Sequence, residues 1–298
     1  MKTPIFTGAA VAIITPMLPD GSVDYKGLAD LIEFQIKGGT DAVVICGTTG
    51  ESATLKDDEH LECIRVAVET AAGRIPVIAG TGSNYTEHAV EMSKEAKARG
   101  ADALLLVTPY YNKTTQRGLV ASFNTIVDAA GLPAILYNVP SRTGVNIESA
   151  TAKELAKNPL ICGIKEASGN ISQIAMTAAL CGDELPLYSG NDDQVVPILA
   201  LGGKGVISVV SNVAPEPMHR MCQLWFEGKT KESLDLQLQL MGLCKAMFCE
   251  VNPIPVKTAL NLLGWDVGPL RLPLCDPTEA GLEKIKTALE RYGLTART

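Results

Sequence analysis

Lys165 lies at the end of the apolar segment 160–164, whose composition is otherwise that of a buried strand. A buried lysine loses solvation of its ammonium group, so its pKa falls and a neutral amine is present at physiological pH. A neutral amine attacks carbonyl carbon atoms. The structural alternative is a side chain that extends from the strand end to water. This segment alone favours the structural alternative, so the other polar segments of the chain must decide.

Hydroxyls, glycines and one arginine follow other apolar segments in the same way. These polar segments are 47–51, 80–84, 108–112, 137–144 and 189–192. Together they offer amides and hydroxyls for a carboxylate, an amine for a carbonyl and a phenol for proton transfer, which suits a small keto acid. Each one also has a structural alternative. Segment 47–51 fits a helix-capping turn, Tyr110 and Tyr111 fit loop aromatics packed on a helix, and Arg142 fits a solvated turn residue.

Other chemistries find little support in the sequence. His60, His88 and His219 lie in helix-like segments without ligand spacing, so we expect solvated helix-face histidines and no metal site. Segment 47–51 lacks the Gly-Lys-Ser/Thr of a nucleotide-binding loop, and no Gly-x-Ser-x-Gly elbow is present. Residues 202–205 (Gly-Gly-Lys-Gly) precede a predicted strand, so we interpret them as a tight turn on the face opposite the site.

The elements that would position these groups alternate between strand and helix. We expect strands at 9–15, 41–47, 75–80, 103–108, 133–138, 162–166, 187–190 and 205–210, and helices between them that include 25–37, 57–72, 86–98 and 116–129. Strands that are apolar throughout suit a parallel sheet covered on both faces. Eight such units predict an α/β fold, the (β/α)8 TIM barrel, whose reactive groups follow the strands. A doubly wound sheet is less favoured because no Gly-x-Gly-x-x-Gly follows the first strand.

The chain after residue 228 has a different pattern. Segments 232–248, 254–263 and 278–291 are predicted helices without strands between them. We therefore expect a catalytic barrel over 1–228 and a C-terminal helical region over 229–298, which could serve as an oligomer interface.

Composition narrows the class of protein. The 298 residues carry a formal net charge of −7, which argues against nonspecific binding to nucleic acid or anionic membranes. The longest apolar segments are too short to span a bilayer, and the start of the chain lacks a signal-peptide pattern. The 8 cysteines are scattered and fit free thiols in a reducing cytoplasm.

Three motifs in register, at predicted strand ends, carry a resemblance to a known family. They are Gly47-Thr48-Thr49-Gly50-Glu51, the segment 137–144 (Tyr-Asn-Val-Pro-Ser-Arg-Thr-Gly) and the segment 163–167 (Gly-Ile-Lys-Glu-Ala). The chain closely resembles the dihydrodipicolinate synthase family of pyruvate-dependent class I aldolase-like lyases over essentially its whole length. The resemblance implies condensation of pyruvate with L-aspartate 4-semialdehyde to 4-hydroxy-tetrahydrodipicolinate, in the diaminopimelate route to lysine.

The resemblance also implies catalytic roles. Lys165 would form a Schiff base with pyruvate, with no metal or organic cofactor. Tyr137 would shuttle protons, linked through Thr48 to Tyr111. In the family, this last tyrosine reaches the neighbouring subunit's site, and the usual assembly is a homotetramer.

Four further residues would bind substrate. Thr49 would hold the pyruvate carboxylate, and Arg142 would hold the carboxylate of the semialdehyde through its planar fork. Gly190 and the carbonyl of Ile207 would line the site.

Two alternatives share parts of this pattern. N-acetylneuraminate lyases and keto-sugar-acid aldolases share the barrel and the lysine but tend to lack the Thr48-Thr49 pair and the arginine at 142. A keto-acid-binding regulator on the same scaffold would require loss of a catalytic group, and none is missing.

Family members that are inhibited by lysine bind it at the dimer interface. The residues of this chain that match are Ser52, Ala53, His60, Asn84 and Tyr110. Two positions depart from the pattern: Asp57 stands where a histidine is common, and His88 stands where a glutamate binds the amine of the effector. A histidine is a poor partner for an ammonium, so we expect weak or absent inhibition by lysine.

Overall fold

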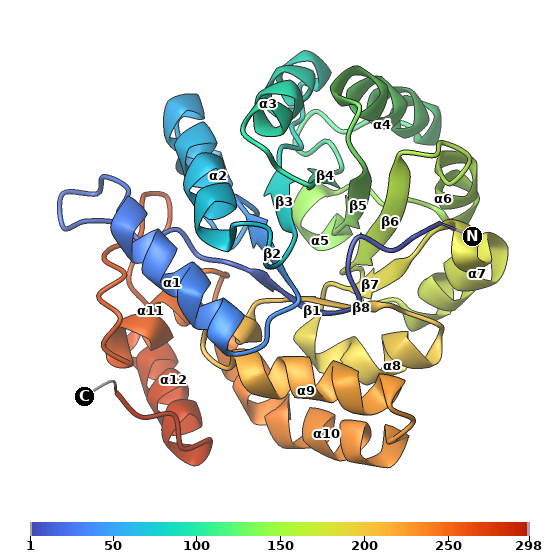
Figure 1. The fold of residues 1–298 in the computed structure, drawn as a ribbon. Coiled ribbons are helices and arrows are strands. Elements are labelled where there is room, and N and C mark those ends of the chain that lie inside the picture. Colours follow the sequence, from blue (N-terminus) through green and yellow to red (C-terminus); the bar gives the residue numbers. More distant parts are fainter. Residues whose placement is uncertain (1, 297–298) are drawn as a thin grey trace.

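Eight parallel strands close into a barrel in the computed structural model, which describes residues 2–296 (Figure 1). Each strand pairs with its neighbours in chain order, and β1 pairs with β8. The predicted TIM barrel is therefore confirmed. The strands are β1 (Gly8–Ala12), β2 (Ala42–Ile45), β3 (Val77–Gly80), β4 (Ala103–Val107), β5 (Ala134–Asn138), β6 (Ile161–Glu166), β7 (Leu187–Ser189) and β8 (Gly205–Ser208).

A ring of helices surrounds the strands in Figure 1. It consists of α1 (Tyr25–Lys37), α2 (Asp57–Ala71), α3 (Thr86–Ala98), α4 (Gln116–Ala130), α6 (Ser149–Leu155), α7 (Ile171–Cys181), α8 (Val195–Ala200) and α9 (Pro215–Phe226). A short helix, α5 (Pro140–Thr143), follows β5 directly. The C-terminal region adds α10 (Thr230–Met247), α11 (Ile254–Leu262) and α12 (Glu279–Arg291), of which α10 lies beside α9.

Side-chain caps mark where several of these helices begin. Asp24 accepts a hydrogen bond from the Gly27 amide at 2.9 Å at the start of α1, and Asn170 accepts one from the Gln173 amide at 3.1 Å at the start of α7. Such caps satisfy amides that have no partner within the helix. The four helices predicted between the first strands agree with the structure to within one residue.

Most strands end earlier than their apolar segments. Strand β1 ends at Ala12 although residues 13–15 are buried, and β2 ends at Ile45 although Cys46 is buried. Cys46 has a left-handed backbone with φ of 54°, which ends the extended conformation. The buried residues beyond the strand ends therefore belong to the loops that carry the polar segments.

The interior of the barrel is filled by alanines, by branched aliphatic side chains and by three aromatic rings. Ala10, Ala12 and Ala42 are among its buried residues. Phe6 and Tyr188 stack with ring centroids 4.5 Å apart, and the Tyr188 hydroxyl donates to the Phe6 carbonyl at 2.8 Å. Because Phe6 precedes β1, this stack lies towards the N-terminal end of the barrel.

The turn at 202–205 also lies at the N-terminal end, as predicted. Gly205 has a φ of 150°, and a Cβ there would lie 1.8 Å from the Gly8 carbonyl oxygen. The close approach of two strands therefore explains the glycine, and no anion site is needed to account for it.

The prediction of three solvated histidines is wrong for His60, which is buried, with Nε2 2.9 Å from the Gly80 carbonyl oxygen. His219 is half-buried and lies 2.8 Å from an Asp41 carboxylate oxygen. Amphipathic spacing could not show these contacts, because each joins residues of different elements.

The cysteines are all free, as predicted. Within residues 2–296, no helix is long and apolar enough to cross a membrane, and no cluster of metal-ligating side chains occurs.

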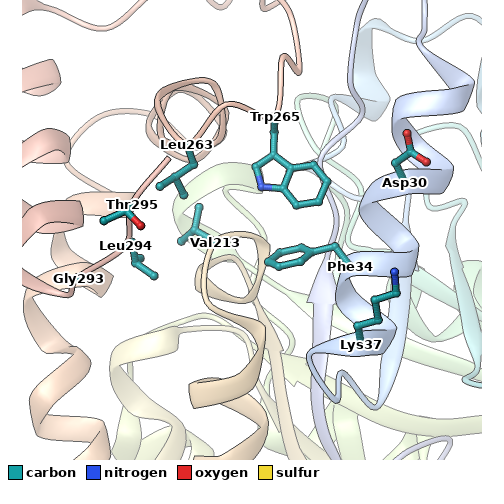
Figure 2. A pocket seen from close by; sticks show the side chains of 9 residues that line it. All are labelled: Asp30, Phe34, Lys37, Val213, Leu263, Trp265, Gly293, Leu294 and Thr295. Carbon is teal, nitrogen blue, oxygen red and sulfur yellow. The ribbon is translucent and has the colours of Figure 1, made fainter. Parts of the chain in front are cut away.

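One cavity lies outside the barrel, between α1 and the C-terminal segments. It measures about 320 Å³, and Figure 2 shows Phe34 and Lys37 of α1 on one side with Trp265 above and Leu294 opposite. None of the predicted site residues lines it.

Candidate active site

Lys165 and Tyr137 lie side by side near the C-terminal end of the barrel. They are register partners on β6 and β5, and parallel register neighbours point to the same face. The Lys165 Nζ atom lies 4.3 Å from the centre of the Tyr137 ring. Lys165 is only 5% exposed, so its side chain does not extend to water. The structural alternative for this lysine is therefore wrong.

The pKa of Lys165 is lowered to about 8, mainly by burial. The negative charge of Asp192 opposes this shift, and the positive charge of Arg142 adds to it. A pKa near 8 leaves about a tenth of the amine neutral at pH 7, compared with less than a thousandth for an ordinary lysine. The site therefore holds a nucleophilic amine near neutral pH.

Asp192, in the short helix η3 (Asp192–Gln194), is a residue that the sequence analysis did not select. It is 2% exposed, and its Oδ2 atom accepts hydrogen bonds from the amides of Val209 and Val210 at 3.0 and 3.1 Å. Burial raises its pKa, which those bonds and Lys165 oppose. Its position after β7 was the only sequence signal, because the sequence could not show that it faces the lysine.

Tyr137 is buried, and burial raises its pKa. Arg142 and a hydrogen bond with the Thr48 side chain oppose that rise. The phenol therefore stays protonated at neutral pH and has a hydroxyl partner, which suits a group that relays protons.

Asn252 connects the two predicted carboxylate-binding residues. Its side-chain amide donates to the Thr49 hydroxyl at 3.0 Å, and its backbone carbonyl accepts a hydrogen bond from Arg142 Nη2 at 3.2 Å. Asn252 precedes α11, so the C-terminal helical region supplies a group at the catalytic end of the barrel. Asn252 was not among the site residues selected from the sequence.

A cavity of about 190 Å³ gathers six of the eight predicted catalytic and substrate-binding residues. Lining it are Thr48, Thr49, Tyr137, Arg142, Lys165 and Gly190. Glycine is required at 190 because a Cβ there would lie 3.0 Å from Lys165 Cε and 2.8 Å from the Ala167 Cβ. The volume suits a small substrate of a few heavy atoms beside the amine.

Ile207 and Tyr111 do not line this cavity. Ile207 is fully buried in the barrel interior on β8. Tyr111 is 92% exposed, with a left-handed backbone of φ 67°, and Tyr110 is 38% exposed. Tyr111 therefore does not pack on a neighbouring helix, and within a single chain it projects into solvent.

A second cavity, of about 540 Å³, adjoins the first and shares Thr48, Tyr137 and Arg142 with it. Four of the five predicted effector residues line it, namely Ser52, Ala53, His60 and Tyr110, together with Asp57 and His88. Asn84 is not in its lining, and the Asn84 carbonyl accepts a hydrogen bond from the Asn112 side chain at 2.9 Å.

Two histidines line this second cavity. Burial lowers the pKa of His60 to about 4, so its ring is neutral at pH 7. His88 Nε2 lies 3.1 Å from an Asp57 carboxylate oxygen. The two positions that depart from the effector pattern therefore contact each other.

Comparisons with known proteins agree with this geometry. The model of the dihydrodipicolinate synthetase family matches residues 5–292. The 4-hydroxy-tetrahydrodipicolinate synthase 1 of Clostridium acetobutylicum is 56% identical over 290 residues, which cover 97% of this chain and 99% of the relative.

Two solved structures share the fold. The chloride-inhibited dihydrodipicolinate synthase of Acinetobacter baumannii, complexed with pyruvate, superposes with a TM-score of 0.94 at 44% identity and covers 97% of this chain and 99% of its own. The enzyme of Cyanidioschyzon merolae with lysine bound has a TM-score of 0.95 at 42% identity, with 98% and 100% covered.

Proposed function

This chain belongs to the dihydrodipicolinate synthetase family, and we propose that it condenses pyruvate with L-aspartate 4-semialdehyde to give 4-hydroxy-tetrahydrodipicolinate. This reaction is a step in the route through diaminopimelate to lysine. The observation that carries the proposal is the buried Lys165 amine, which lies beside Tyr137 in the cavity and whose pKa of about 8 makes it a nucleophile near neutral pH.

Imine formation is the first step of the proposed reaction. The neutral Lys165 amine attacks the keto carbon of pyruvate, and the resulting carbinolamine loses water to give a protonated imine. Tyr137 donates the proton that the departing oxygen needs, and Thr48 replaces it through the hydrogen bond between them. Thr49 binds the pyruvate carboxylate, with its hydroxyl oriented by Asn252.

Carbon–carbon bond formation follows from the imine. The protonated nitrogen withdraws electrons, so the methyl group loses a proton and an enamine forms. The enamine carbon attacks the aldehyde of the semialdehyde, whose carboxylate is held by Arg142. The amino group of the bound product then attacks the imine carbon and closes the ring, and this transimination releases Lys165 as a free amine.

The proposal makes the enzyme independent of metal and organic cofactors, because the lysine imine itself is the electron sink. It also places the enzyme in the cytoplasm. In a homotetramer built of dimers, the exposed Tyr111 of one subunit would complete the proton relay of its neighbour. The 92% exposure of this side chain in the single chain supports a role in a contact between subunits.

The second cavity supports an effector site with weak affinity for lysine. An ammonium gains most from a carboxylate partner that is free to bind it. Here His88 occupies the glutamate position and pairs with Asp57, so that carboxylate already has a partner. We therefore expect little inhibition by lysine.

Borohydride reduction in the presence of pyruvate tests the central step. Reduction of the imine would leave a stable adduct, and peptide mass mapping would place it on Lys165. A missing adduct on that residue would overturn the proposal.

Comparing turnover of pyruvate with aspartate semialdehyde against pyruvate with N-acetylmannosamine then separates the synthase from a sialic acid lyase. We expect turnover with the first pair only. An adduct without turnover of either pair would instead indicate a keto-acid-binding regulator.

A further inference from the structure

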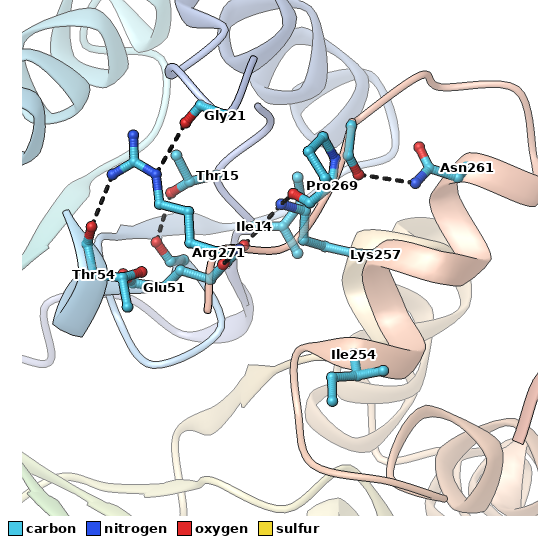
Figure 3. Close-up of polar contacts among 12 residues, drawn as sticks. Ile14, Thr15, Gly21, Glu51, Thr54, Ile254, Lys257, Asn261, Pro269 and Arg271 are labelled. Atoms are coloured by element: carbon cyan, nitrogen blue, oxygen red, sulfur yellow. Dashed lines mark hydrogen bonds and ion pairs between the residues drawn. The ribbon is translucent and has the colours of Figure 1, made fainter. Parts of the chain in front are cut away.

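A buried ion pair joins the C-terminal region to the loop that carries Thr48 and Thr49. Lys257 of α11 donates from Nζ to Glu51 Oε1 at 2.7 Å, and the two side chains are 1% and 0% exposed. Figure 3 shows Lys257 reaching from α11 towards the Glu51 loop. The catalytic steps above use neither residue.

Each polar group of this pair has a second partner. Lys257 Nζ also donates to the Pro269 carbonyl at 2.7 Å, and Glu51 Oε2 accepts from the Arg271 amide at 3.0 Å. Burial lowers the pKa of Lys257, and the charge of Glu51 opposes that shift. Full satisfaction of both charges is the condition under which a buried pair persists.

The loop between β2 and η1 (Ser52–Thr54) needs such an external support. Cys46 and Glu51 both have a φ of 54°, so left-handed residues stand on either side of Gly47-Thr48-Thr49-Gly50. A left-handed backbone conformation is unfavourable for residues other than glycine and persists only where the surrounding structure imposes it. Glu51 is thus both a strained residue and the point at which the C-terminal region holds the loop.

Additional contacts hold the same loop from two other directions. Thr15 Oγ1 donates to the Gly50 carbonyl at 2.7 Å, and Asn252 donates to Thr49 at 3.0 Å. The Arg271 guanidinium donates to the Thr54 carbonyl at 2.8 Å, as Figure 3 shows. The Glu51–Lys257 pair is the only one of these that places two opposite charges in the interior.

We propose that Glu51 and Lys257 are positioning residues for the pyruvate site: their buried ion pair fixes the loop that presents Thr48 and Thr49 to the cavity beside Lys165. This inference rests on the proposed function. It assigns to α11 a task in substrate binding, in addition to its packing on the barrel.

The test compares a double variant that removes both charges of the ion pair with a control variant that loses a polar contact far from the Thr48 loop. In the double variant E51Q/K257M, no uncompensated charge is left in the interior. In the control variant, His219→Gln weakens the contact with Asp41 at the opposite end of β2, where it cannot reach the Thr48 loop. Thermal melting and circular dichroism measure folding. The rate of borohydride trapping as a function of pyruvate concentration measures formation of the Lys165 adduct.

We expect the double variant to fold and to need at least about tenfold more pyruvate for half-maximal trapping, because misplacing a binding group by about 1 Å can cost about a hundredfold in rate. The His219→Gln control should melt earlier than the wild type while its dependence on pyruvate is unchanged. Unaltered pyruvate dependence in the folded double variant would overturn the proposal, as would an equal change in the control.

Two further outcomes remain interpretable. If the double variant does not fold, Glu51→Gln alone keeps the shape of the side chain and should raise the pyruvate requirement several-fold; an unchanged requirement would overturn the proposal. If the wild type itself gives no adduct on Lys165, the proposed function fails, and this result is distinct from failure of the ion-pair proposal.

Discussion

The charges around Lys165 set the pH at which its amine can react. Burial and the charge of Arg142 lower its pKa to about 8, and the charge of Asp192 opposes them. Because only the neutral amine attacks, the rate of imine formation at low pyruvate should rise with pH and level off above pH 8. The buried aspartate therefore tunes the working range of the nucleophile, although it contacts no substrate in the proposed mechanism.

Replacing Asp192 with asparagine tests this tuning. The negative charge favours the ammonium form, so its removal should lower the pKa of Lys165 and move the pH midpoint of borohydride trapping below the wild-type value. At pH 7 the trapping rate should rise by at most about tenfold, the limit reached when all of the amine is neutral. The exposed neighbour variant Asp193→Asn should leave the midpoint unchanged. A midpoint that stays in place or rises in Asp192→Asn would contradict the assignment.

His88 gives a second prediction at the scale of one residue. Its contact with Asp57 leaves the second cavity without a carboxylate free to bind an ammonium. His88→Glu should restore such a partner and lower the lysine concentration for half-inhibition by about tenfold or more, since charge-assisted hydrogen bonds are the strong ones.

His88→Gln, which adds no charge, is the control for this variant and should behave like the wild type. Inhibition constants measured with the condensation assay would decide the matter. Half-inhibition of the wild type in the low micromolar to submillimolar range would show that the cavity binds lysine without this carboxylate.

Strand ends are the elements that bring the catalytic groups together. Gly190 directly follows β7 and donates from its amide to the Glu166 carbonyl at 2.7 Å, so the backbone at the end of β7 lies against the backbone at the end of β6. A Cβ at this position would lie 3.0 Å from both Lys165 Cε and the Glu166 carbonyl oxygen. The spacing of these strand ends therefore determines the space available to the nucleophile.

Gly190→Ala should displace Lys165 and slow borohydride trapping by about tenfold to a hundredfold, while costing about 1–3 kcal/mol of folding free energy through overpacking. Gly203→Ala is a matched control, because its Cβ would lie 2.7 Å from the Ile198 carbonyl oxygen at the opposite end of the barrel. Both variants should melt earlier than the wild type, but only Gly190→Ala should trap pyruvate slowly. Equal trapping rates in the two variants would mean that the Gly190 contact has no effect on the amine.

The sequence predicted the elements well where local patterns determine them. Uniformly apolar segments located all eight strands, and amphipathic spacing located the four helices that were given bounds between the first five strands, because both depend on neighbours along the chain. The strand ends were overestimated, since buried residues such as Cys46 continue past the point where the backbone leaves the extended conformation.

Contacts between distant elements could not be predicted. The charge of Asp192 acts on Lys165, Asn252 bridges Thr49 and Arg142, and Lys257 reaches Glu51 across 206 positions of the chain. Each depends on which side chains meet after the barrel closes, and no periodicity within one segment carries that information. Likewise, His60 occupies a polar-looking helix position but reaches the end of β3.

At the scale of the whole molecule, a single chain leaves the proposed proton relay incomplete. Six of the eight predicted catalytic and substrate-binding residues line one cavity, but Tyr111 projects into solvent with 92% of its surface exposed. The backbone at this residue is left-handed, with a φ of 67°. Under the proposed function, this tyrosine would have a catalytic use only in an assembly with a second copy of the chain.

Tyr111→Phe isolates the hydroxyl from the ring. We expect turnover to fall by about a hundredfold, within the range of general acid–base contributions, while borohydride trapping of pyruvate persists because Lys165 and Thr49 are unaltered. Unchanged turnover in this variant would contradict the relay.

Mixing two inactive variants tests whether the hydroxyl is supplied by another subunit. A Tyr111→Phe subunit retains Lys165 but would receive its relay tyrosine from its neighbour, and a Lys165→Ala subunit retains Tyr111 but has no nucleophile. In a hybrid dimer, the site of the first subunit would contain its own Lys165 and the second subunit's Tyr111. Unfolding and refolding the two variants together should therefore restore up to about a quarter of the wild-type activity per subunit. This is the fraction of sites that are complete when subunits pair at random. Separately refolded variants, mixed afterwards, provide the baseline. If co-refolded mixtures stay at that baseline although light scattering shows oligomers, Tyr111 does not supply its hydroxyl to the site of a neighbouring subunit.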